Sequence, residues 1–127
     1  MRTITSIVKG VTFADEESGQ DRQAFIGTLP DEPFVLQPKL EPDNPYDANA
    51  IGLWVTRETG DGPQACRVGH ISRDLSADLA ARMRAGETLR VQGFKENAVI
   101  RGQPIVGIRI AISVSQRRRT VALRDSI

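Results

Sequence analysis

Residues 105–114, IVGIRIAISV, carry the most regular pattern in the chain and limit what it can fold into. Large aliphatic residues alternate with small or polar ones over seven positions. The aliphatic set is Ile108, Ile110, Ile112 and Val114, and the set between them is Gly107, Arg109, Ala111 and Ser113. Strict alternation with a period of two predicts a β-strand that buries one face.

Shorter strands are predicted elsewhere from β-branched and alternating apolar residues. The first is interrupted at Gly10, and Pro38 places the second at a sheet edge or a bulge. The ranges are 4–13, 34–40, 50–56, 65–71 and 89–94. The segments 57–64 and 95–104 between them have the polar, Gly- and Pro-containing composition of loops.

Two helices are predicted. The first spans 21–29 and is ended by Pro30. The clearer one spans 72–85, where Leu75, Leu79 and Met83 recur every four residues. Ser72 is placed to cap its start and Gly86 to terminate it.

This order of elements has no βαβ rhythm and no internal repeat, so it favours an antiparallel sheet. We expect a mainly β (α+β) fold, a small six-stranded OB-like barrel with two helices packed outside. At 127 residues the chain suits one domain, predicted over 1–114, followed by a basic tail over 115–127.

Composition excludes several classes of protein. A single cysteine, Cys66, and a single histidine rule out an internal disulfide and a zinc site built from these residues, and we expect no cofactor. The N-terminus lacks the features of a signal peptide, and no run approaches the roughly 18 apolar residues of a membrane span. We therefore expect a cytoplasmic protein without a membrane partner. Trp54 is expected to pack in the core or on the barrel wall.

The net charge is only +1, but it is unevenly distributed. Residues 1–50 carry four positive and nine negative side chains, a net of −5, whereas residues 101–127 carry six positive and one negative, a net of +5. Such a dipolar chain can approach a polyanion locally even though its total charge is small.

Residues 41–51, EPDNPYDANAI, concentrate polar turn residues around the sole tyrosine. Asn, Asp and Pro are typical of a tight turn, and Asn49 is expected to bond the turn backbone. An aromatic ring beside a carboxylate also suits a nucleic-acid terminus, because the ring can stack on a base while the carboxylate accepts a hydrogen bond from a hydroxyl. Residue chemistry alone leaves both readings open.

Two groups of residues, one in this stretch and one further along the chain, support the interpretation as a nucleic-acid site. The first comprises Pro42, Asn44, Pro45, Tyr46, Asp47, Asn49, Ala50 and Ile51, and the second comprises Val68, Gly69, His70, Ile71, Arg73, Leu75, Leu79 and Ala80. With these blocks at this spacing, residues 3–114 resemble a HIRAN domain. That family is a small β-barrel module found at the N-terminus of SWI/SNF-type DNA-remodelling ATPases and alone in bacteria.

The resemblance implies binding of the 3′ end of single-stranded DNA. It assigns base stacking to Tyr46, the 3′-hydroxyl to Asp47 and the shape of the pocket to Asn44. His70 and Arg73 would meet backbone phosphates, and Arg73 lies in the first turn of its helix, which favours an anion.

The sequence departs from the family pattern where other aromatic residues are expected. Ile7 and Val8 stand near the positions of a tyrosine pair in the first strand, with Phe13 as a possible substitute. The late loop offers only Phe94 before it and Arg101 within it. These departures predict weaker binding of DNA ends, or a different ligand.

No nucleotide-binding loop, nucleophile elbow or pair of carboxylates with a base is visible, so we expect no enzyme. The favoured hypothesis is a module that recognises single-stranded DNA ends in DNA repair or replication restart, with an ATPase or helicase supplied by another chain. The alternative is a protein-interaction barrel that acts as an adaptor in a larger complex.

Overall fold

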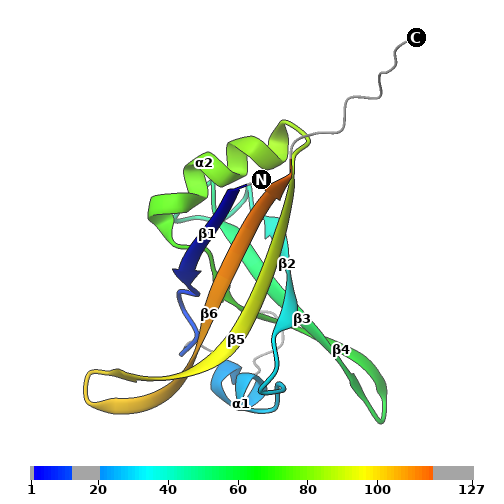
Figure 1. Cartoon of the computed structure of the whole chain (residues 1–127), viewed down its shortest axis with the longest axis vertical. Coiled ribbons are helices and arrows are strands. Elements are labelled where there is room, and N and C mark those ends of the chain that lie inside the picture. The colour runs from blue at the N-terminus through cyan, green and yellow to red at the C-terminus, as the bar shows by residue number, and fades with distance from the viewer. Residues whose placement is uncertain (1, 13–20, 116–127) are drawn as a thin grey trace.

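A computed structural model describes residues 2–12 and 21–115 of the protein. The described residues form six strands and two helices, shown in Figure 1. The strands are β1 (Arg2–Ile7), β2 (Phe34–Leu40), β3 (Ile51–Thr59), β4 (Gly62–His70), β5 (Thr88–Ile100) and β6 (Gln103–Ser115), and the helices are α1 (Arg22–Gly27) and α2 (Arg73–Arg84). The predicted mainly β composition is confirmed.

All six strands pair antiparallel in one sheet, in the order β1-β6-β5-β2-β3-β4. Strand β2 changes partner along its length. Its first half, 34–36, pairs with β5, and its second half, 37–40, pairs with β3. Pro38 lies in the half that pairs only with β3, so the prediction that this proline sits at an edge-like position is correct, since proline has no N–H to donate to a second neighbour.

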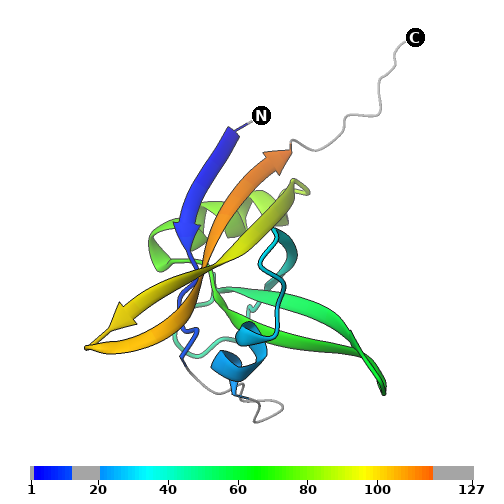
Figure 2. The same ribbon diagram turned by 60° about the horizontal axis from the view of Figure 1, so that its bottom comes forward.

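The expected closed barrel is not shown by the structure. The two end strands, β1 and β4, share no ladder in the described residues. They approach at one isolated bridge just beyond β1, where Lys9 and His70 exchange backbone hydrogen bonds of 2.9 and 2.8 Å. The sheet is strongly curved (Figure 2). Within residues 2–12 and 21–115, this bridge is the backbone pairing between the β1 end and β4.

The core lies inside the curved sheet, where the alternating residues of β6 are completely buried: Ile108, Ile110 and Ile112. The two helices pack at opposite ends of the sheet, α1 against β4 and β6 and α2 against β5 (Figure 1). Helix α2 follows its predicted pattern, because Leu79 is buried and Gly86, with φ of 92°, terminates the helix. Ser72 occupies the N-cap position, but its side chain makes no capping hydrogen bond.

The two segments predicted as loops form strands instead. Residues 57–64 extend β3 and β4 up to a turn at Gly60 and Asp61, and residues 95–104 extend β5 and β6 as a projecting hairpin (Figure 1). Composition misled here because a two-stranded arm satisfies its backbone groups by cross-strand pairing and needs little apolar surface. Arg101 and Gly102, both with positive φ, make the turn between β5 and β6.

Two sequence predictions fall outside the described residues. Phe13 is one, and the basic tail is the other, apart from Ser115, which is the last residue of β6. In the part of the chain that is described, no helix is long and apolar enough to cross a membrane.

Candidate nucleic-acid interface

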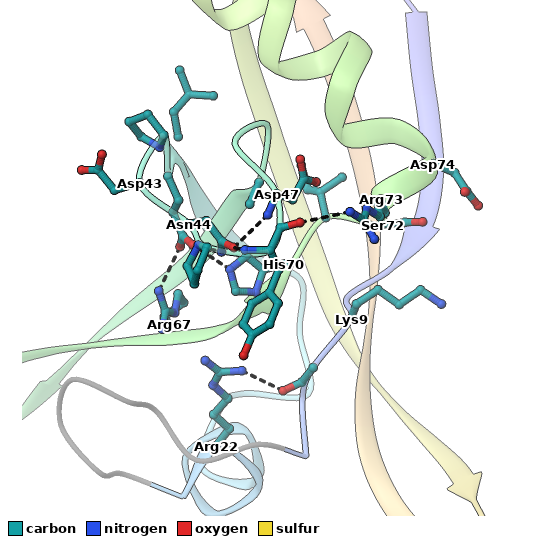
Figure 3. Close-up of a pocket in the computed structure, with 18 residues that line it drawn as sticks. Lys9, Arg22, Asp43, Asn44, Asp47, Arg67, His70, Ser72, Arg73 and Asp74 are labelled. Carbon is teal, nitrogen blue, oxygen red and sulfur yellow. Dashed lines mark hydrogen bonds and ion pairs between the residues drawn. The ribbon is translucent and has the colours of Figure 1, made fainter.

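A pocket of about 970 Å³ lies where the N-terminus of α2 meets the bridge between β1 and β4. This volume is at the upper end of the range of small-molecule sites. Four parts of the chain line it (Figure 3): Lys9, Gly10 and Arg22; residues 40–47 with Ala50; Arg67; and residues 70–74.

The loop between β2 and β3 is first shaped by its own side chains. Asn44 Oδ1 accepts hydrogen bonds from the backbone N–H groups of Tyr46, at 2.9 Å, and Asp47, at 3.2 Å. Asp47 Oδ1 accepts one from the N–H of Asn49 at 2.9 Å. These are the side-chain to backbone bonds expected of a tight turn. The turn reading and the pocket reading of EPDNPYDANAI are therefore compatible.

Helix α2 holds this loop from one side through residues at its start and at its end. Arg73 Nη2 donates to the carbonyl oxygen of Tyr46 at 3.0 Å, and the buried Ser76 Oγ donates to Asp47 Oδ2 at 3.2 Å. Arg84 donates to Asn49 Oδ1 at 2.8 Å and to the carbonyl oxygen of Ala48 at 3.0 Å. Asn49 is thus structural, as predicted, although its side chain bonds an arginine rather than the turn backbone.

Glu41 connects the residues that form the floor of the pocket. Its Oε1 accepts a hydrogen bond from Asn44 Nδ2 at 3.1 Å and lies 2.9 Å from His70 Nε2, and its Oε2 accepts one from Arg67 Nη1 at 3.0 Å. Partial burial acts to raise the pKa of Glu41, but the hydrogen bonds from His70, Asn44 and Arg67, with the charge of His70, outweigh it and lower that pKa. Gly52 makes the arrangement possible, because a Cβ there would collide with Glu41 Oε2.

All five predicted site residues line this one pocket: Asn44, Tyr46, Asp47, His70 and Arg73. Their side chains are engaged to different degrees. Asn44, Asp47 and His70 are bonded within the protein, and Arg73 holds the loop. Tyr46 is 84% exposed as a residue, which leaves its ring available to a ligand.

Besides Asp43 and Asp74 at its margins, the sequence interpretation missed four charged residues of the pocket. Lys9 is exposed at the rim, and the buried Arg22 reaches in from α1 and donates to the carbonyl oxygen of Gly10 at 2.8 Å (Figure 3). Arg67 and Glu41 form the ion pair of the floor. Of these four, only Glu41 could have been suspected from the sequence, because it is the first residue of the EPDNPYDANAI stretch. The positions of the other three in the pocket depend on which strands meet.

Phe13 lies outside the described residues, and the other positions at which further aromatics were expected do not line the pocket. Val8 is buried in the core, and Ile7 is about half exposed but does not line the pocket. Phe94 and Arg101 are not among the lining residues either. In the described part of the chain, Tyr46 is therefore the aromatic side chain of the pocket.

The pocket is balanced in formal charge, with four cations and four carboxylates: Lys9, Arg22, Arg67 and Arg73 against Glu41, Asp43, Asp47 and Asp74. The carboxylates are not equally placed. Glu41 and Asp47 are occupied by internal donors, whereas Asp43 and Asp74 lie at opposite margins and point outward (Figure 3). Among the described residues no group of His, Cys, Asp and Glu could hold a metal ion.

The fold and this pocket define a class of small antiparallel β module with a pocket beside a helix N-terminus. The family model of the HIRAN domain matches residues 25–115, and the chain belongs to that family. HIRAN domains are DNA-binding modules rather than catalytic domains. The resemblance found in the sequence is thereby confirmed.

Comparison of structures gives a match to the crystal structure of the HIRAN domain of human HLTF. The two share 18% sequence identity, with a TM-score of 0.49, and the match covers 90% of this chain and 76% of that one. No curated protein matches the sequence.

Proposed function

We propose that this protein is a single-stranded DNA-binding module that recognises free 3′-hydroxyl ends. Its role would be in DNA repair or replication restart, with an ATPase or helicase supplied by another chain. The observation that carries the proposal is the exposed Tyr46 ring on a pocket that also presents Asp47, Arg73 and Lys9. Membership of a DNA-binding family supports the same ligand class.

The roles of the side chains follow from their chemistry. A base stacked on Tyr46 contributes about 1–3 kcal/mol with little dependence on sequence. Asp47 uses each carboxylate oxygen once internally, and a carboxylate offers about four lone-pair positions, so it can still accept a bond from a terminal hydroxyl. A terminal phosphate at the same place would be repelled.

The phosphates of the strand would meet Lys9 and Arg73. Lys9 is exposed and has no side-chain partner among the described residues. Arg73 lies in the first turn of α2, where the backbone N–H groups and the helix dipole also favour an anion. His70 contacts Glu41 and would therefore support the floor of the pocket in addition to contacting a phosphate.

Fluorescence anisotropy tests the proposal with short oligonucleotides that end in a 3′-hydroxyl or a 3′-phosphate. We expect the hydroxyl end to bind more tightly, Tyr46→Ala to weaken both ends by roughly 5- to 100-fold, and Asp47→Asn to abolish the preference. Asp43→Asn, the same change at the margin of the pocket, is the matched control. Equal binding of both ends by the unmodified protein would disprove end recognition.

The charge balance of the pocket gives some support to the alternative, a protein-interaction module. A salt titration separates the two functions. Binding of DNA weakens steeply as salt rises, because each neutralised phosphate releases condensed counterions. A peptide in the same pocket would respond weakly, and failure to bind any oligonucleotide at low salt would favour the peptide.

A further inference from the structure

Trp54 lies on the same face of the sheet as the floor of the pocket. Gly52 of β3 pairs with Lys39 on one side and with His70 on the other, and two residues further along Trp54 pairs with Arg67. Residues two apart on a strand, and cross-strand partners, point to the same side. Trp54 and Lys39 therefore lie on the side of the sheet that forms the floor of the pocket, although they do not line the pocket itself.

This surface combines an indole ring with a mobile cation. Trp54 is half-buried on the wall of the sheet, one of the two places predicted for it, and Lys39 Nζ lies 4.8 Å from the centroid of its ring. Lys39 is exposed, so its side chain can leave the ring at small cost. An aromatic face beside a cation is the pairing that sequence-independent single-strand binding uses.

The charges nearby suit a polyanion. The nearest carboxylate on this face, Glu41, is already bonded to Arg67 and His70. Glu58, the next along β3, lies four residues beyond Trp54 toward the turn that ends the β3–β4 hairpin. Across β2, Arg90 of β5 is exposed on the same side.

We propose that a single strand held by its 3′ end in the pocket continues over this face, where a base stacks on Trp54 and Lys39 contacts a phosphate. The inference rests on the proposed function and extends its footprint beyond the pocket. On binding, the base replaces the ammonium over the indole, and the lysine side chain turns to the adjoining phosphate. Trp54 thus supplies the second aromatic surface that β1 lacks.

Tryptophan fluorescence tests this without any substitution, because Trp54 is the sole tryptophan of the chain. The probes are a thymidine trinucleotide and a thymidine dodecamer, both with a 3′-hydroxyl. We expect the trinucleotide to bind without quenching Trp54 and the dodecamer to quench it and to bind roughly 5- to 100-fold more tightly.

Variants show whether the added affinity comes from this face. Trp54→Leu, which keeps an apolar side chain, should remove most of the difference between dodecamer and trinucleotide while leaving trinucleotide binding intact. Lys39→Gln should reduce it by several-fold. Lys95→Gln, which removes the same charge beside α1, where Lys95 pairs with Asp31, should leave it unchanged.

The outcomes separate the two proposals. Trinucleotide binding that depends on Tyr46, together with equal dodecamer affinity and an unquenched Trp54, would overturn this inference alone. Absence of binding at both lengths would overturn the proposed function and the inference with it. Quenching that persists in Tyr46→Ala at unchanged affinity would show that the face does not continue from the pocket.

Discussion

The two walls of the pocket are built differently. On the α2 side, the loop that carries Tyr46 and Asp47 is fixed by side chains from both ends of the helix, Arg73 and Ser76 at its start and Arg84 at its end. On the β1 side, the wall at Lys9 is held by its two backbone bonds with His70 and bears an unpartnered ammonium among the described residues.

The two walls therefore differ in how much of their structure is already fixed before a ligand binds. The α2 wall presents the ring and the carboxylate in set positions, so little entropy is lost there when a ligand binds. The Lys9 side chain keeps its rotamer freedom until an anion fixes it, which costs on the order of 1 kcal/mol. Recognition of a chain terminus should therefore depend on the α2 wall, and salt dependence on the β1 wall.

The junction of the two walls is the most sensitive point, and Gly69→Ala tests it. A Cβ at residue 69 would collide with the Lys9 carbonyl oxygen and lie 2.5 Å from Val8 Cγ1, and φ there is 158°. We expect a loss of unfolding free energy on the order of 3 kcal/mol, measured by urea denaturation. Binding should fall as well, because the β1 wall can no longer close on His70.

Gly27→Ala is the control for that experiment. Gly27 is helical, and a Cβ there meets nothing within 4 Å, so the substitution should be neutral or slightly stabilising. If Gly69→Ala were as stable as Gly27→Ala, the bridge between the walls would not be the constraint that the geometry indicates.

The floor beneath both walls gives a smaller effect with a defined pH dependence. The pKa of Glu41 is lowered from its ordinary 4.5, so its contribution to stability is complete above that value and is lost as the pH falls through the lower pKa of the folded state. Glu41→Gln should cost about 1–2 kcal/mol near neutral pH. The cost should shrink below pH 4.5.

Urea denaturation across pH 3–7 would measure this, with Glu58→Gln on the exposed face of β3 as the matched control. We expect the control to follow the unmodified protein at every pH. A Glu41→Gln variant whose deficit stayed constant down to the acid limit would show that the carboxylate acts by shape and not by charge.

The strands with strong patterns were predictable, because alternation reports burial of one face. Residues 105–114 show this, since Ile108, Ile110 and Ile112 are fully buried as predicted. The hairpin arms at 57–64 and 95–104 were not, because their strands are stabilised mainly by backbone pairing, which leaves little trace in side-chain composition. A barrel was predicted for a related reason. Whether β1 and β4 pair depends on the curvature of the whole sheet, which side-chain patterns do not report, and the two ends meet at one bridge between Lys9 and His70 in the described residues.

The site was predictable where its residues are close in sequence. Asn44, Tyr46 and Asp47 share one turn, and His70 and Arg73 flank one helix start, so their grouping needed only that the two segments meet. Lys9 and Arg22 could not be found in this way, because they lie far from the loop in the sequence and belong to no motif shared with it. The curvature of the sheet brings them to the pocket. The internal bonds of Asp47 were equally invisible, since Ser76 follows it by 29 residues.

The smallest predicted effect concerns Arg84, at the far end of the α2 wall. Its two bonds to Asn49 and Ala48 lie at the surface, so Arg84→Ala should lower stability by less than about 1 kcal/mol. The loop should nevertheless loosen. The N–H of Ala50, bonded to the Asp47 carbonyl oxygen at 3.0 Å, should exchange with solvent several-fold faster.

Arg82→Ala separates this local effect from the loss of a positive charge. Arg82 lies two residues away on α2 and pairs with Asp78 and Glu87 instead of the loop. It should change stability by a similar amount but leave the exchange of Ala50 and the preference for a 3′-hydroxyl unaltered. If the two variants loosened the loop equally, the loop would be ordered by the hydrogen bonds of the Asn44 turn and not by Arg84. The two walls would then differ only in the freedom of the Lys9 side chain.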